Sequence, residues 1–174
     1  MVFREVTEVS YEKILLCNEC NSFFTLFLIT CNFDRQQDQI EKELNIDMSN
    51  GREISQSDDH GGFHNEGTSC IVYRFSDDSV LNQIRKDNSW KAFPMDETVT
   101  ALVYGTTDES SSVGPYLKDD GGNTLVPEIQ NGYYVLIDRQ MNEEEDILHR
   151  ASFNFSIGIY DTDTDTLYFC RYDT

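Results

Sequence analysis

The sequence has 174 residues, of which 39% are hydrophobic and 12% aromatic, and this composition excludes an intrinsically disordered chain. Its length fits one domain with a core of its own. The 13 Lys and Arg residues against 32 Asp and Glu residues give a formal net charge of -19 at pH 7, which disfavours nucleic-acid binding because polyanions repel such a surface. The charge would suit a protein partner with a basic surface, but a solvated acidic surface also accounts for it.

The N-terminal segment, residues 1–35, is interpreted as a signal-like or tether segment ahead of a single α+β domain at residues 36–174. Residues 22–30 (SFFTLFLIT) form an apolar run that is too short to span a bilayer as a helix but has the length of the apolar core of a secretory signal. Cys31 follows this run, and residues 28–31 resemble the bacterial lipobox, in which the cysteine is lipidated and becomes the mature N-terminus. The resemblance implies attachment to the extracytoplasmic face of the cell membrane through an N-terminal lipid.

Two features of this segment depart from a lipoprotein signal. Thr30 stands where lipoboxes favour Gly, Ala or Ser, and glutamates precede the apolar run where a signal should be net positive. The alternative is a buried strand of a cytoplasmic protein, because Phe, Thr, Leu and Ile in a short run are typical of a central strand.

The first element expected after this segment is a short helix at residues 36–44, where apolar residues recur at helical spacing. A longer helix is predicted at residues 77–86, with Ser76 as its N-cap. Trp90 is expected to pin the exit of this helix to the core, because so large an aromatic side chain is usually buried. Residues 97–104 fit either a short helix or a strand.

Runs of β-branched and aromatic residues predict the strands, at residues 52–56, 68–75, 132–138, 152–160 and 166–172. The last two are joined by DTDTDT, which predicts a hairpin turn better than a calcium loop because Gly and Glu are absent from the positions where such a loop needs them. Residues 106–127 read as a long loop. The expected fold is α+β: an antiparallel sheet of about five strands with one main helix packed on a face and a C-terminal β-meander.

Five cysteines are too few for a disulfide scaffold, and their odd number leaves at least one unpaired within a monomer. Cys70 and Cys170 lie in predicted strands, where a disulfide and two buried thiols are both open. Cys17 and Cys20 form a Cys-x-x-Cys pair without the second pair of ligands that a zinc site needs.

The stretch at residues 57–67, SDDHGGFHNEG, is the candidate metal site. Asp59, His60, His64 and Glu66 carry the side chains that bind divalent metals. The two histidines would lie too far apart in an extended strand, so they can share a metal only if the loop curls. The glycines permit that curl, and they equally permit a plain turn leading into the next strand. No motif for a nucleophile accompanies this stretch, and no cofactor other than a divalent metal is suggested.

Several separated blocks resemble a family of small, uncharacterised proteins from Gram-positive bacteria. The blocks are NIDMSNG (45–51), SDDHGGFHNEG (57–67), WKAFPM (90–95), NGYYVLIDR (131–139), FNFSIGIYDTDTDTLYF (153–169) and the terminal YDT. Members of this family show an H-G-G-F-H-G-D-G block, so that Asn65 here replaces a glycine and Glu66 an aspartate. The resemblance implies no activity, but many members carry an N-terminal apolar segment that often ends in cysteine, which favours lipidation of Cys31.

Three functional hypotheses follow. The first is a non-enzymatic acidic binding domain, anchored to the membrane as a lipoprotein, that binds another macromolecule or a wall component. The second is a cytoplasmic, immunity-type protein that neutralises a basic toxin. The third is a metal-dependent hydrolase that uses the loop at residues 58–66.

Overall fold

The computed structural model describes residues 36–61, 66–107, 111–140 and 145–174. It divides into two units, Met1–Glu43 and Leu44–Thr174. In the first unit the described residues are helical, and the helix runs to residue 44, as predicted. The signal-like run and Cys31 lie outside the described residues. All strands of the described residues belong to the second unit.

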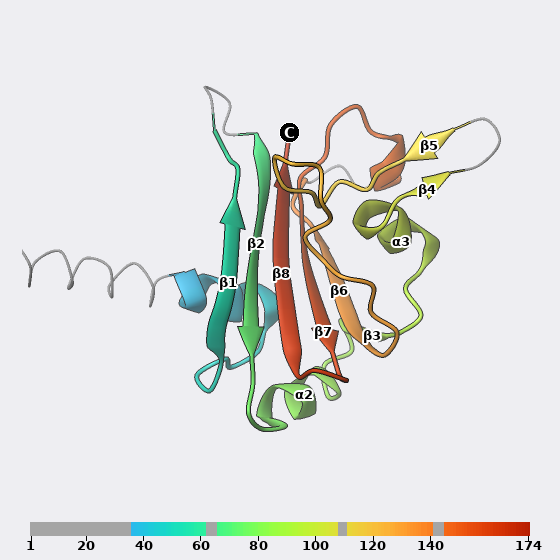
Figure 1. Ribbon diagram of the computed structural model, residues 1–174. Coiled ribbons are helices and arrows are strands. Elements are labelled where there is room, and N and C mark those ends of the chain that lie inside the picture. Colours follow the sequence, from blue (N-terminus) through green and yellow to red (C-terminus); the bar gives the residue numbers. More distant parts are fainter. Residues whose placement is uncertain (1–35, 62–65, 108–110, 141–144) are drawn as a thin grey trace, which may run out of the picture. The chain divides into compact units, whose positions relative to one another are not determined.

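A six-stranded sheet forms the second unit, and every neighbouring pair in it is antiparallel (Figure 1). In spatial order its strands are β1 (Arg52–Asp58), β2 (Gly67–Arg74), β8 (Thr166–Asp173), β7 (Phe155–Asp161), β6 (Gly132–Asp138) and β3 (Lys91–Ala92). This architecture confirms the α+β prediction and the C-terminal meander. The sheet has one strand more than expected because β3, with two residues, is too short to leave a periodic pattern.

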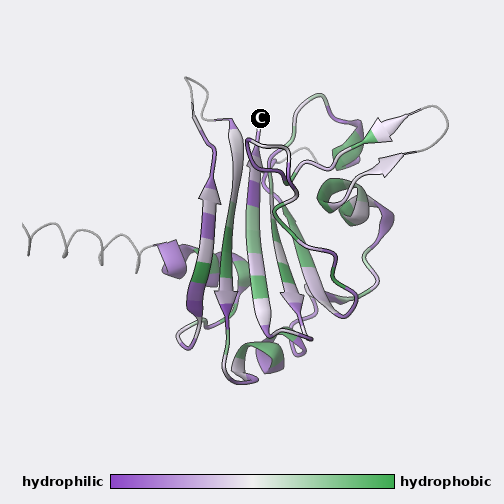
Figure 2. Ribbon diagram, in the orientation of Figure 1, coloured by the Kyte–Doolittle hydropathy of each residue, from purple (hydrophilic) through white to green (hydrophobic). Residues whose placement is uncertain are grey.

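Strand β7 lies inside the sheet and is buried along its whole length. Its sequence, FSIGIYD, places Phe155, Ile157 and Ile159 on one face and Ser156, Gly158 and Tyr160 on the other. Figure 2 shows the same alternation of apolar and polar residues along the neighbouring strands. The sheet is covered on both faces at β7, whereas the edge strand β1 has no buried residue.

The face that carries Ile157 is covered by α3 (Glu97–Val103), by residues 114–130 and by the short 3-10 helix η1 (Ile147–His149) (Figure 1). Leu102 of α3 and Leu117 of the long segment are fully buried there. Residues 97–104, ambiguous in the sequence, form a helix because the Asp96 carboxylate accepts a hydrogen bond from the Val99 N–H (2.9 Å) and caps it.

On the opposite face Gly158 makes room for two large side chains. A Cβ atom at this position would lie 2.8 Å from Leu44 Cδ2 and 2.9 Å from Trp90 Cη2. Trp90 is 6% exposed, and its Nε1–H donates to the Leu44 carbonyl (3.4 Å). The predicted burial of Trp90 is thus confirmed.

Cys70 and Cys170 form a disulfide. They are directly opposite each other on β2 and β8, with their Cα atoms 4.0 Å apart, and both side chains are buried. Of the two alternatives that the sequence left open, the structure shows the bridge.

Most strand ends lie within two residues of the sequence prediction, and the larger differences are at α2, at residues 106–127 and at the start of β7. Helix α2 (Ser79–Ile84) is shorter than residues 77–86, and its N-cap is Asp78, not Ser76. The reason is that the Asp77 carboxylate accepts from the Ser79 N–H (2.9 Å), which makes a turn ahead of the helix. Residues 106–127 are not all loop, because they contain the small hairpin of β4 (Thr106–Thr107) and β5 (Ser112–Val113). Strand β7 begins at Phe155 and not at residue 152.

The DTDTDT stretch is the tight turn between β7 and β8, as predicted. Asp165 has a φ of 51°, and the Asp161 carboxylate accepts from the Asp163 N–H (2.9 Å) and the Thr164 hydroxyl (2.6 Å). Burial and the nearby Asp165 raise the pKa of Tyr160, the aromatic residue just before the turn. These aspartates organise the backbone of the hairpin.

Replacing Gly158 with valine should destabilise the fold by about 2–3 kcal/mol, because Leu44 and Trp90 leave no space for a side chain. Urea denaturation measures the loss. The matched control is Gly61→Val: a Cβ at Gly61 has no neighbour closer than 3.8 Å, and we expect a change within about 0.5 kcal/mol. Equal effects of the two substitutions would contradict this account of the packing.

Candidate ligand-binding site

The stretch 57–67 spans the end of β1 and the tip of the β1–β2 hairpin, which an isolated bridge between Gly61 and Glu66 closes. The Asp59 carboxylate accepts from the Thr68 N–H, so this side chain is turned back onto the hairpin. The predicted turn falls on residues 62–65, which lie outside the described residues and include Asn65.

His60 contacts two carboxylates. Its Nδ1 lies 2.7 Å from Asp58 Oδ1 and its Nε2 lies 3.1 Å from Asp173 Oδ2, and its side chain is 13% exposed. Both ring nitrogens therefore have a partner. Asp173 also pairs with Arg139, whose Nη2 lies 2.7 Å from Asp173 Oδ1 and donates to the Phe155 and Tyr172 carbonyls. These contacts tie the hairpin to the C-terminal strand.

Within the described ranges, no group of three or more His, Cys, Asp or Glu side chains is arranged to hold a metal ion. Of the four residues predicted as ligands, Asp59 and His60 have the partners given above, and Glu66 is exposed at the closing bridge. His64 lies outside the described residues. A metal site that includes it stays a prediction.

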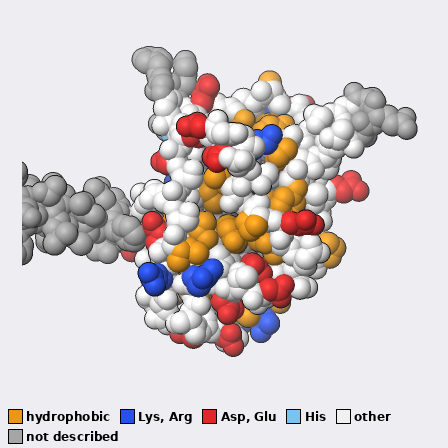
Figure 3. All heavy atoms as spheres, viewed as in Figure 1, with side chains coloured by type: hydrophobic (Ala, Val, Ile, Leu, Met, Phe, Trp, Pro, Cys, Tyr) orange, Lys and Arg blue, Asp and Glu red, His pale blue; other side chains and the backbone are white. Residues whose placement is uncertain are grey.

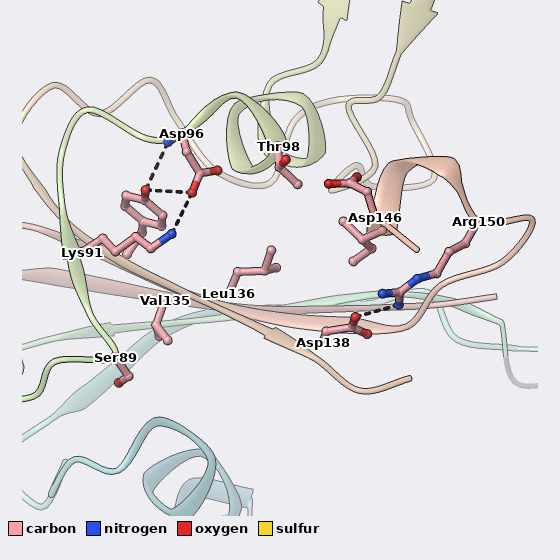
Figure 4. Close-up of a pocket in the computed structure, with 11 residues that line it drawn as sticks. Ser89, Lys91, Asp96, Thr98, Val135, Leu136, Asp138, Asp146 and Arg150 are labelled. Carbon is pink, nitrogen blue, oxygen red and sulfur yellow. Dashed lines mark hydrogen bonds and ion pairs between the residues drawn. The ribbon is translucent and has the colours of Figure 1, made fainter. Parts of the chain in front are cut away.

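A cavity of about 330 Å³ lies between β6, α3 and η1 (Figure 4). Leu136 and Asp138 reach it from β6, Thr98 from α3, and Asp146 and Arg150 from the two ends of η1. Among the described residues, β3 pairs only with Tyr133 and Tyr134, so the edge of β6 beyond them carries no further strand. The cavity occupies this uncovered edge.

One end of the cavity is built around the Asp96 carboxylate. Lys91 Nζ lies 3.0 Å from Asp96 Oδ2, and the Tyr134 hydroxyl donates to the same oxygen (3.2 Å). Partial burial acts to raise the pKa of Asp96, but the Val99 N–H, Lys91 and Tyr134 outweigh it and hold this pKa below its usual value of 3.8. Both carboxylate oxygens of Asp96 are thus already bound within the protein.

The other end carries a buried guanidinium. The Arg150 side chain is 8% exposed; its Nη1 lies 2.6 Å from Asp138 Oδ2, and its Nε donates to the Glu145 carbonyl (2.9 Å). Asp146 Oδ1 accepts from the Leu148 N–H (2.9 Å) and caps η1. Although Asp146 and Arg150 both project toward the cavity, they form no ion pair with each other in the part of the chain that the structure describes.

The sequence did not single out this cavity. Asp138 and Arg150 come together because the chain folds back after η1, and no motif joins two such residues.

Two further surface features lie on the face that carries Ile157. A wider hollow of about 450 Å³ is lined by Phe93, Met95, Tyr104 and other residues. Figure 3 shows apolar side chains across the middle of this face and basic side chains over the lower ends of β1 and β2, where Arg52 and Arg74 are cross-strand neighbours. Ile54, which is 44% exposed, lies in β1 beside Arg52.

Comparison with known proteins gave no match: no family model fits the chain, and no curated protein or solved structure matches it. In the part of the chain that the structure describes, no helix combines the length and the apolar character needed to cross a membrane.

His60→Ala should lower the free energy of unfolding by about 1–3 kcal/mol, because it removes a 13%-exposed ring together with its contacts to Asp58 and Asp173. Urea denaturation in the presence of a chelator measures this loss without any metal. His149→Ala, in an exposed position, is the control. A role of His60 confined to metal binding predicts the opposite result, with the chelated protein unaffected by His60→Ala.

Asp96→Asn should destabilise the protein by less than about 1 kcal/mol at pH 7, because the pair with Lys91 is solvent-exposed. The asparagine oxygen keeps the helix cap, whereas Asp96→Ala removes it and costs about 1 kcal/mol more.

The lowered pKa of Asp96 means that its charged form adds stability above pH 3.8, and that this stability is lost as the pH falls through the value in the folded state. Urea denaturation at pH 7 and pH 3 should therefore show the wild type and Asp96→Asn converging at low pH. A constant difference between the two would contradict this role of the carboxylate.

Proposed function

We propose that the protein is a non-enzymatic binding domain on the extracytoplasmic face of the cell membrane, attached through a lipid on Cys31. The observation that carries this proposal is the buried disulfide between Cys70 and Cys170. Disulfides of this structural kind form and persist in oxidising environments and are rare in the cytosol. The bridge therefore supports export, which the lipobox-like residues 28–31 would direct.

The disulfide also suits a domain that must hold its fold outside the cell. It joins residues 100 positions apart, and a crosslink that closes a loop of this length stabilises a chain by about 4–5 kcal/mol in the chain-entropy model. Such a contribution is a large share of the stability of a small domain.

The binding part of the proposal rests on the cavity beside β6. Its volume of about 330 Å³ is in the range of small-molecule sites, and its charged side chains are fixed by partners within the protein. Lys91 pairs with Asp96, and Arg150 pairs with Asp138. These groups offer donors and acceptors in set positions, as a binding site requires.

Growth of the producing cells with a radioactive fatty acid tests the attachment. We expect the wild type to be labelled and Cys31→Ser to remain unlabelled. Cys20→Ser, which removes another N-terminal cysteine, is the matched control and should be labelled like the wild type. The proposal fails if wild type and Cys31→Ser carry the same label.

The state of the other two cysteines in intact cells gives an independent test. Alkylation of free thiols during denaturation, without reductant, should leave Cys70 and Cys170 unmodified, because they are bridged. Full modification of both after denaturation without reductant would contradict export. It would favour a cytoplasmic protein, the location expected of an immunity-type inhibitor of a basic toxin.

A further inference from the structure

The cavity beside β6 holds two opposite charges that do not meet. Asp146 and Arg150 both project into it from η1, and no ion pair joins them within the described residues. We propose that this cavity binds a free α-amino acid with an apolar side chain. The inference rests on the proposed binding function and names the ligand of that site.

The hydrogen-bonding groups left over in the cavity define the head of this ligand. Arg150 Nε donates to the Glu145 carbonyl, whereas Nη1 forms an ion pair with Asp138 but makes no hydrogen bond, and no described residue accepts a hydrogen bond from Nη2. Asp146 uses Oδ1 as the cap of η1, which leaves Oδ2 without a donor in the described part of the chain. The Thr98 hydroxyl, opposite them on α3, likewise has no described partner. One cationic donor, one anionic acceptor and one hydroxyl remain.

An α-amino acid supplies the complement of these three groups. Its ammonium can donate to Asp146 Oδ2, and its carboxylate can accept from Arg150 Nη2 and from the Thr98 hydroxyl. Both charges of the ligand then find a partner, which matters because an unpaired charge in a half-enclosed cavity is costly.

Other ligand charges fit less well. Three carboxylates (Asp96, Asp138 and Asp146) and two cations (Lys91 and Arg150) line the cavity, so a pure anion would meet a net negative surface. A pure cation would find Asp146 but would leave the 8%-exposed Arg150 with an unused donor. A zwitterion satisfies both ends.

The wall between the charged ends suits an apolar side chain. Leu136 from β6 and the buried Ile147 from η1 both line the cavity. A volume of about 330 Å³ accommodates a branched aliphatic amino acid with its first water molecules, at the lower end of the range for small-molecule sites. Leucine is therefore the first probe.

Isothermal titration of the purified full chain with L-leucine, alanine, valine, methionine and phenylalanine tests the proposal. We expect at least one of them to bind with a Kd below about 1 mM. For that amino acid the N-acetyl derivative, which lacks the ammonium, and the amide, which lacks the carboxylate, should each bind at least about tenfold more weakly.

Two variants test the residues. Asp146→Asn keeps the cap of η1 through its amide oxygen and should weaken binding about tenfold or more, and Thr98→Val should weaken it severalfold. Glu97→Gln removes one exposed charge next to Thr98 without lining the cavity and should bind like the wild type. Thermal melting of each variant confirms that it folds.

Absence of binding by the whole panel at about 10 mM would overturn the proposal. So would equal binding of the amino acid and its N-acetyl or amide derivative, or unchanged binding by folded Asp146→Asn. The titration needs neither lipid nor membrane. A failed titration would therefore overturn the ligand proposal and not the membrane attachment, and a failed labelling of Cys31 would overturn the attachment and not the ligand proposal.

Discussion

The burial of β7 on both faces is the constraint on which the rest of the structure depends. All seven residues of β7 are buried, those on the face of Ile157 and those on the face of Gly158 alike. Gly158 lets Leu44 and Trp90 approach one face, while α3 and the segment at residues 114–130 cover the other. Once α3 is held there, its cap at Asp96 and its neighbour Thr98 are placed beside the edge of β6. The cavity follows from how the core is closed.

The basic side chains at the two ends of the cavity are paired within the protein. Lys91 is exposed and lies 3.0 Å from Asp96, and the nearly buried Arg150 lies 2.6 Å from Asp138, so the buried cation has a carboxylate beside it. Two aspartates that line the cavity also accept hydrogen bonds from backbone N–H groups: Asp96 caps α3 and Asp146 caps η1. Asp96 and Asp146 therefore each cap a helix and line the cavity. A substitution that removes the capping oxygen affects the helix end as well as the cavity, whereas asparagine keeps the cap.

The sequence predicted the parts of this fold that depend on local patterns. The alternation in residues 153–169 defines β7, β8 and their hairpin, and the aspartates of DTDTDT define the turn. The ambiguity at residues 97–104 could not be resolved because the deciding group, Asp96, acts through a single hydrogen bond. The pairing of Cys70 with Cys170 depends on the register between β2 and β8, which no local pattern fixes. The cavity was missed for the same reason, since Asp138 and Arg150 meet only after the chain has folded.

The disulfide makes a closed ring of the chain from Cys70 to Cys170. This ring contains α2, α3, η1 and the hairpin of β4 and β5, together with the strands β3, β6 and β7. A single proteolytic cut anywhere within it, including in the segments that join β4 to β5 or β6 to η1, leaves the two pieces covalently linked. The two pieces would separate only after reduction of the disulfide, so a nick in this part of the chain shows in electrophoresis only when a reductant is present.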